Sequence, residues 1–264
     1  MTSIPVSELA AWLDEYLRIR EIPDEAGAVN GLQMESRGGI GRIVAAVDAS
    51  QATLDGATAG DPESSGGSTL LLVHHGLLWD GNQPVTGRRY RRLRALMETD
   101  TALYSAHIPL DVHPEVGNNI CLARALRLEV GGSFGAYRGL MLGVWGVHPV
   151  GPTRVRLCEE VAAAIGIAPS SIKLIPGGPP NVGRVGILTG AGGSYIGAAR
   201  EAGLDTIITG EGPHHTYFDA IEGGMNVLYA GHYATESLGI QALAAGLGEQ
   251  FGLPWAFHPH PTGM

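Results

Sequence analysis

Histidines and carboxylates stand close together at two places in the chain, in patterns that suit a divalent metal ion. His74 and His75 end an apolar run and directly precede Gly76. His232 and Glu236 lie four residues apart near the C-terminus, a spacing that puts two side chains on one face of a helix. Imidazole nitrogens and carboxylate oxygens are common ligands of divalent transition metals. The pattern predicts a metalloprotein, with two metals.

The adjacent histidines have a structural interpretation beside this functional one. Successive residues of a strand point to opposite faces, so a turn is needed to bring both rings toward one cleft. Gly76 permits such a turn because it lacks a Cβ atom, and this favours the functional interpretation. An HxxxE spacing often occurs by chance. His232 and Glu236 are therefore interpreted as metal ligands only in combination with the histidine pair. Glu236 is then the candidate to bridge two ions through its two carboxylate oxygens.

A further segment, from His107 to Asp111, adds one imidazole and one carboxylate. Pro109 prevents an ordinary helix between them, so their side chains need not share a face. Asp111 is the stronger ligand candidate, and its alternative role is to cap the turn that follows. His107 is either a ligand or a group that orients a ligand, and as a catalytic residue it would carry protons.

Two glycine-containing segments offer weaker signals. His215 follows a predicted strand and is a candidate proton carrier at the rim of a cleft, with a solvent-facing histidine as the equal alternative. The glycine-rich turn at residues 189–194 lies between a strand and a helix, as phosphate-binding turns do. It fits neither GxGxxG nor a P-loop, so a plain tight connection is preferred over phosphate binding or a nucleotide-binding regulator. No nucleophile elbow is present, which argues against covalent acyl chemistry.

The elements that must position these residues alternate along the chain. Strands are predicted at residues 42–48, 69–73, 102–106, 137–147, 171–175, 185–188, 206–209, 227–230 and 255–258. Helices are predicted at residues 6–20, from 50, and at 87–98, 118–126, 153–165, 194–202, 214–222 and 233–251, with a surface loop at 60–68. The alternation predicts an α/β fold of two interlinked lobes, whose mixed sheets are covered by helices. The lobes are residues 1–130 with the C-terminal helix, and residues 131–230.

Composition narrows the class of protein. The 264 residues can bury a substantial core, and 44% hydrophobic against 16% charged residues indicates a globular chain. The net charge of −9 argues against a nucleic-acid partner. The basic stretch at residues 88–94 is expected to form a solvated helix face or a subunit contact; an RNA site or an entry point for an anionic substrate are the alternatives.

The cellular setting follows from what the chain lacks in its sequence. Cys121 and Cys158 lie far apart in helical patterns, so they are expected to be core residues in a reducing compartment and not a disulfide. No apolar run approaches the ~18 residues of a membrane-spanning helix. No signal peptide is visible. We therefore expect a cytoplasmic protein with no membrane partner.

The motifs, taken in order, resemble the Nif-three-like dinuclear metal proteins, also catalogued as GTP cyclohydrolase 1 type 2 homologues. The resemblance spans nearly the whole chain and rests on NGLQ at 30–33, HHG at 74–76, SAHIPLD at 105–111, GNN at 117–119, TGE…H at 209–215 and GHYATE at 231–236. One departure is Gly212-Pro213-His214, which stands where such proteins usually have a lysine-containing stretch. No substrate contact is carried over for that loop.

The resemblance implies a ligand set, an assembly and a function. Two divalent metal ions per chain would be held by His74, His75, Asp111, His232 and Glu236, with Glu236 shared. The chain would be a single unit without the inserted domain of longer members, assembled as a toroidal homohexamer whose sites face an internal cavity. The expected function is a metal-dependent hydrolase of a small polar or nucleotide substrate, similar to GTP cyclohydrolase, in which His107 or His215 moves protons. A non-enzymatic metal-binding scaffold or metallochaperone is the alternative, and zinc, manganese, iron, cobalt and nickel all suit the donors.

Overall fold

The structure is a computed structural model that describes residues 3–57 and 66–264. The chain divides into two compact units, one formed by Met1–Leu110 with Ile240–His260 and the other by Asp111–Gly239 with Pro261–Met264. Each unit has one mixed β-sheet and covering helices, so the predicted α/β class is confirmed. The surface loop predicted at residues 60–68 lies mostly outside the described residues. No described helix combines the length and the apolar character that a membrane crossing requires.

The first unit contains a five-stranded sheet in the order β1-β4-β3-β2-β11. Its strands are β1 (Gly31–Met34), β2 (Ile40–Asp48), β3 (Ser68–His75), β4 (Thr101–Ser105) and β11 (Trp255–Phe257). All neighbours pair in parallel except β1, which pairs antiparallel with β4 at the edge. Every residue of β3 up to His74 is buried, as expected for a parallel strand covered on both faces.

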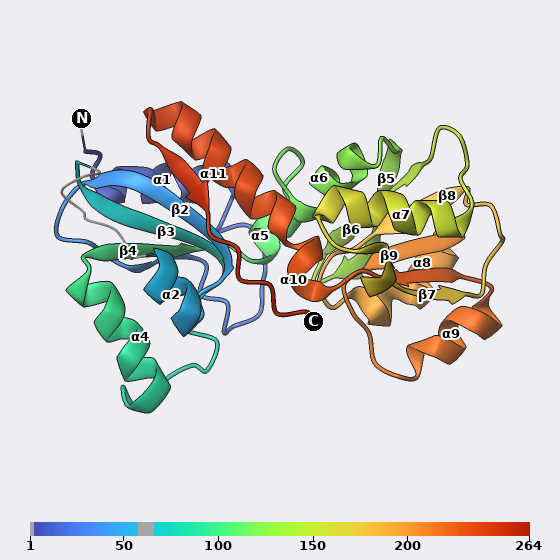
Figure 1. The fold of residues 1–264 in the computed structure, drawn as a ribbon, viewed down its shortest axis with the longest axis horizontal. Coiled ribbons are helices and arrows are strands. Elements are labelled where there is room, and N and C mark those ends of the chain that lie inside the picture. The colour runs from blue at the N-terminus through green and yellow to red at the C-terminus, as the bar shows by residue number, and fades with distance from the viewer. Residues whose placement is uncertain (1–2, 58–65) are drawn as a thin grey trace. The chain divides into compact units, whose positions relative to one another are not determined.

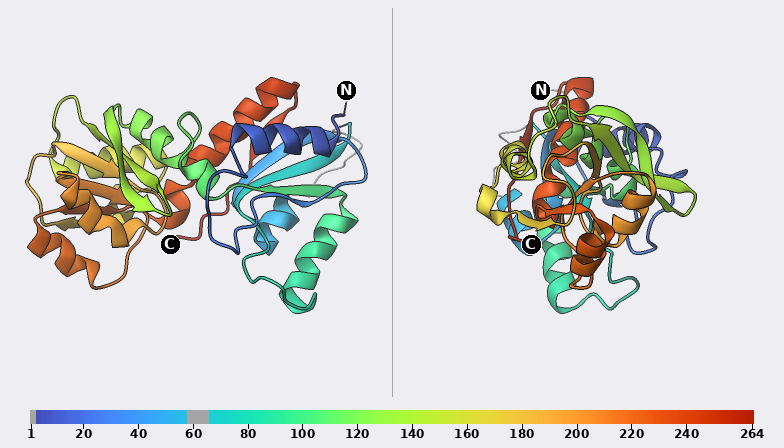
Figure 2. Two further views of the ribbon diagram at one scale, coloured as in Figure 1. Left: turned by 180° about the vertical axis from the view of Figure 1, so that it is seen from behind. Right: turned by 90° about the vertical axis from the view of Figure 1, so that its right-hand side faces the viewer.

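Two pairs of helices cover this sheet. Figure 1 shows α2 (Gln51–Ala57) and α4 (Gly87–Glu98) on one side, where Leu54 and Leu96 join a core with Leu71 and Leu103. On the other side lie α1 (Val6–Tyr16) and α11 (Ser237–Phe251), the blue and red helices of Figure 2. Apolar residues at helical spacing give α1 its buried face. Because β3 and β4 are parallel neighbours, their carboxyl ends lie at the same edge of the sheet, and the candidate metal-binding histidines lie there.

The second unit contains a six-stranded sheet in the order β5-β6-β8-β9-β10-β7. Its strands are β5 (Glu129–Tyr137), β6 (Leu140–Val147), β7 (Lys173–Pro176), β8 (Arg184–Ile187), β9 (Thr206–Thr209) and β10 (Asn226–Tyr229). The central strands β8, β9 and β10 are parallel, and antiparallel strands flank them on both sides. The sheet is mixed, as predicted.

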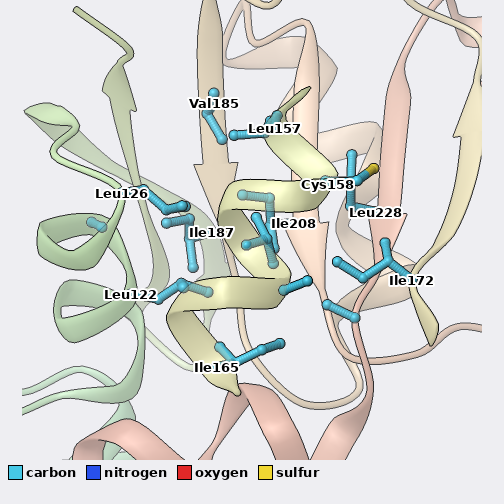
Figure 3. Packing of buried hydrophobic residues seen from close by; sticks show 14 of the residues in the cluster. Leu122, Leu126, Leu157, Cys158, Ile165, Ile172, Val185, Ile187, Ile208 and Leu228 are labelled. Atoms are coloured by element: carbon cyan, nitrogen blue, oxygen red, sulfur yellow. The ribbon is translucent and has the colours of Figure 1, made fainter. Parts of the chain in front are cut away.

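Alternate side chains of the central strands enter two separate cores. Ile208 and Leu228 pack against α6 (Asn118–Ala125) and α7 (Arg154–Ile165), as Figure 3 shows. Ile207 and Val227, one position earlier on each strand, pack on the opposite side. That side is covered by α8 (Ile196–Glu201) and α9 (Thr216–Gly223). The period of two in a strand thus produces three layers.

Several predictions differ from the structure. The helix predicted at 6–20 ends at Tyr16. Pro109 is expected to prevent an ordinary helix, but it lies in the one-turn helix α5 (Ile108–Asp111), because proline is tolerated in a first helical turn.

The strand predicted at residues 137–147 is the hairpin of β5 and β6, whose turn residues Arg138 and Gly139 both have positive φ. Glycines within β5 weaken its strand signal, and a two-residue turn with positive φ closes the hairpin. The single helix predicted at 233–251 is two helices, α10 (His232–Thr235) and α11, interrupted at Glu236 with φ −99° and ψ 5°.

Candidate metal centre

Three histidines gather where β3 and β4 end in the first unit. His74 and His75 are the last residues of β3, and His107 follows β4 by two positions. The ring centroids lie 4.6 to 5.6 Å apart. One ring nitrogen from each histidine lies within 4.8 Å of those from the other two. This cluster therefore offers three donors that a divalent ion could use.

The histidine pair lies within regular strand, which corrects the predicted role of Gly76. β3 continues through His75, and Gly76 does not adopt a positive φ. A Cβ atom on Gly76 would instead lie 2.3 Å from the side-chain amide nitrogen of Gln33. The carbonyl oxygen of that amide accepts a hydrogen bond of 2.8 Å from the backbone N–H of Leu77. The glycine makes room for Gln33 and does not supply a turn.

Hydrogen bonds fix the orientation of both strand-end imidazoles. Nδ1 of the fully buried His74 lies 2.8 Å from the carbonyl oxygen of Ala106, which can only accept. Nδ1 of His75 lies 2.8 Å from Oδ1 of Asp48, its partner across the β2–β3 pair. A neutral imidazole that donates from Nδ1 carries its lone pair on Nε2. Histidines that bind metals commonly have such an acceptor behind the ring.

His107 is backed by Asp24, a carboxylate that the sequence interpretation did not select. Oδ1 of Asp24 lies 2.8 Å from Nδ1 of His107, and Oδ2 accepts from Asn30 and from the backbone N–H of Ile108. The Asp24 side chain is only 7% exposed. Burial acts to raise the pKa of Asp24, but the hydrogen bond and charge of His107 and the amide of Asn30 together hold it below its ordinary value. The ionised carboxylate of Asp24 therefore orients the ring of His107 within the first unit.

His232 and Glu236 meet in the second unit as their spacing predicts. Nε2 of His232 lies 3.1 Å from Oε2 of the buried Glu236. Nδ1 of His232 lies 2.7 Å from Oε1 of Glu211, which the sequence interpretation did not select. Burial acts to lower the pKa of His232, but the two carboxylates raise it to about 9. Without a metal, the imidazole is therefore protonated on both nitrogens at neutral pH, and it donates from Nδ1 to Glu211 and from Nε2 to Glu236.

The glycine-rich turn at residues 189–194 packs against Glu236. Gly190 has φ +68°, and a Cβ atom there would lie 2.1 Å from Oε1 of Glu236. Its backbone N–H donates to Oγ1 of Thr235 at 3.1 Å. The turn thus brings backbone into contact with the candidate ligand, which only glycine allows.

Two buried asparagines tie Asp111 to the rest of the second unit. Asn118 donates to Oδ1 of Asp111 at 2.8 Å, and its own Oδ1 accepts from the backbone N–H of Gly239. Asn119 donates to the backbone carbonyl of Asp111 and accepts from the N–H of Thr189. The segment at 117–119 therefore orders Asp111 from one side and the glycine-rich turn from the other.

His215 stands apart from these clusters. It is exposed and directly precedes α9. Across residues 3–57 and 66–264, no group of three potential metal ligands includes it. The candidate donors thus comprise His74, His75 and His107 in the first unit and Asp111, His232 and Glu236 in the second.

These features define an α/β protein with candidate metal ligands, histidines and carboxylates, at the ends of its strands and helices. A family model described as Duf34/NIF3 (NGG1p interacting factor 3) matches residues 4–261, and the chain belongs to this family. The resemblance found in the sequence is thereby confirmed.

Relatives and solved structures cover nearly the whole chain. A GTP cyclohydrolase 1 type 2 homolog of Deinococcus radiodurans is 46% identical, with 97% of this chain and 94% of the relative covered. One of Pyrococcus abyssi is 39% identical over 97% of this chain and 98% of the relative. Among solved structures, TTHA1606 from Thermus thermophilus has a TM-score of 0.85 and 36% identity, covering 99% of this chain and 100% of that one. Protein ybgI, described as of unknown function, has a TM-score of 0.86 and 36% identity, covering 98% and 100%.

Proposed function

We propose that the protein binds two divalent metal ions per chain and uses them to hydrolyse a small polar or nucleotide substrate. The ligands are His74, His75, Asp111, His232 and Glu236, with Glu236 shared by both ions. Three imidazoles and two carboxylates form a donor set that zinc, manganese, iron, cobalt and nickel all accept.

The observation that carries this proposal is the way the imidazoles are held. Nδ1 of His74, His75 and His232 each faces an oxygen acceptor at 2.7 to 2.8 Å. Three rings oriented in the same sense are typical of metal ligands, because the acceptor directs Nε2 toward the ion and makes it more basic.

The chain's own residues suggest how protons would move. Bound ions would supply Lewis-acid activation of the substrate. Asp24 holds the proton on Nδ1 of His107, so Nε2 of that ring is the atom that accepts a proton. The exposed His215 is the second candidate proton carrier. The name GTP cyclohydrolase 1 type 2 homolog, given to relatives, makes purine nucleotides the first substrates to test.

A metal-binding scaffold or metallochaperone without turnover is the second candidate. The family description, NGG1p interacting factor 3, names an interacting protein and favours this alternative. We also propose a homohexamer and a cytoplasmic location. Sedimentation of the purified protein tests the first, and fractionation of cells tests the second.

The decisive test is metal content per chain in the wild type, Glu236→Gln and Glu249→Gln. Glu249 is an exposed glutamate on α11 and serves as the matched control. We expect about two ions per chain in the wild type and in the control, and at most about one in Glu236→Gln. A wild type without metal after reconstitution, or a Glu236→Gln protein that retains two ions, would refute the shared site. Full metal content without turnover of any nucleotide would favour the scaffold.

A further inference from the structure

A cavity of about 520 Å³ opens in the second unit, between the edge of its sheet and the start of α9. Tyr229 of β10 and Lys173 of β7 are directly paired across the two strands and both line it. The hydroxyl of Tyr229 is fixed by a 2.5 Å hydrogen bond with Thr216 of α9. The volume lies within the range of small-molecule sites, which are usually preformed.

One cationic side chain, that of Lys173, lines the cavity. Lys173 is the only lysine in the 264 residues of a chain with net charge −9. It is exposed at the cavity wall, and among the described residues no carboxylate forms an ion pair with it. An ammonium group placed this way attracts a phosphate or carboxylate group.

Three aromatic rings stand together at the same cavity. Phe218 lies edge-to-face with His214 at 5.8 Å and with Tyr217 at 5.5 Å. All three line the cavity, and the side chains of Tyr217 and Phe218 are 46% and 50% exposed. The chain has only four phenylalanines, so leaving one half exposed beside a second exposed ring is notable. Exposed ring faces of this kind stack with planar rings.

The cavity is connected through one of its lining residues to a candidate metal ligand of its own unit. Glu211 lines it and lies 2.7 Å from Nδ1 of His232. We propose that the cavity binds a small molecule that joins a planar aromatic ring to an anionic group, with the ring against Phe218 and the anion at Lys173. Its role as the substrate subsite of a metal centre rests on the proposed function, whereas binding itself does not.

The single lysine permits a direct test by chemical labelling. Acetylation of Lys173 is followed by mass spectrometry in metal-loaded and EDTA-treated protein, with the α-amino group as internal reference. The probe is guanosine 5′-monophosphate, and guanosine and ribose 5-phosphate each supply one half of it. We expect the monophosphate to slow acetylation of Lys173 about fivefold or more, and each half to protect less. The rate at the α-amino group stays unchanged.

Matched variants test the two contacts separately. Lys173→Met should weaken binding of the monophosphate about tenfold, and Phe218→Ala about fivefold. Arg127→Met removes an exposed cation elsewhere in the same unit, and Tyr90→Ala removes a half-exposed ring on α4; both should leave the dissociation constant unchanged. Circular dichroism of each variant checks that it folds.

The outcomes separate this proposal from the metal proposal, because metal content is measured on the same samples. Protection of Lys173 in a wild-type protein that takes up no metal even after reconstitution supports the cavity and rejects the metal centre. Full metal content without protection rejects the cavity alone. Equal protection by ribose 5-phosphate and by the monophosphate also overturns the proposal, since the aromatic rings would then contribute nothing.

Discussion

Nδ1 of His107 lies 2.8 Å from Oδ1 of Asp24, a carboxylate 83 positions earlier in the chain. Asn30 completes the arrangement from both sides, because it donates to Asp24 and accepts from the backbone N–H of His107. The rings of Trp79 and His107 are nearly perpendicular, with centroids 4.9 Å apart. Three residues, Asp24, Asn30 and Trp79, therefore set the orientation of His107.

Asp24→Asn should change the tautomer of His107 without removing the metal ions. An amide can donate to Nδ1, which would move the ring proton to Nε2 and abolish its ability to accept one. We expect histidine ¹⁵N shifts to report this exchange, with metal content unchanged and any hydrolytic rate lowered about a hundredfold. A 10- to 100-fold loss of metal affinity, roughly what a disturbed ligand shows, would instead make His107 a ligand.

Gly190→Ala should disrupt the position of Glu236. The new methyl group would lie 2.1 Å from Oε1 of Glu236, at a residue with φ +68°. We expect a loss of about 3 kcal/mol in the free energy of unfolding and a loss of bound metal. Gly203→Ala is the control, since Gly203 has φ +73° and nothing within 4 Å of the point where a methyl group would lie. It should cost about 1 kcal/mol and keep its metal; equal effects of the two substitutions would contradict the close approach.

Asn118→Ala should loosen Asp111 and the start of α11 together. The buried amide donates to the half-buried Asp111 and accepts from the buried N–H of Gly239, so its removal takes one hydrogen bond from each. We expect a cost of about 2 kcal/mol in urea unfolding and weaker metal binding. Asn82→Ala, at an exposed position, should change neither quantity. Unchanged metal affinity in Asn118→Ala would show that Asp111 does not depend on this contact.

Asp100 should make the first unit sensitive to acid. Burial acts to raise its pKa, but hydrogen bonds from Ser68 and from the backbone N–H groups of Arg37 and Gly38 lower it to about 2. A lowered pKa in the folded state stabilises the protein above the unfolded value near 4, and this contribution is lost as the pH falls toward 2.

The measurement is urea unfolding of metal-free protein from pH 7 to pH 2. The wild type should lose about 1 kcal/mol more than Asp100→Asn over the range below pH 4, after allowance for solvent screening. Parallel pH profiles for the two proteins would mean that the carboxylate of Asp100 is not held in its ionised form.

Local patterns in the sequence by themselves determined much of this protein. The strand predicted at 206–209 is β9 at its observed bounds, and the side chains of His232 and Glu236, four residues apart, are in contact at 3.1 Å. Each result follows from local geometry, of one strand in the first case and of one helical turn in the second, and such geometry depends on residues that are neighbours in the sequence. The motifs likewise identify the family, because each of them occurs in this chain and in the same order as in the family.

The hydrogen-bond acceptors behind those side chains depend on the tertiary fold. Asp24, Asp48 and Glu211 lie 83, 27 and 21 positions from the histidines that they orient, and no periodic pattern marks them. The break at Glu236 and the approach of Gly190 to it are also absent from the local pattern, which predicts one continuous helix. Such contacts arise when strands and turns far apart in sequence pack together, so their partners are specified by the whole core and not by the residues beside them.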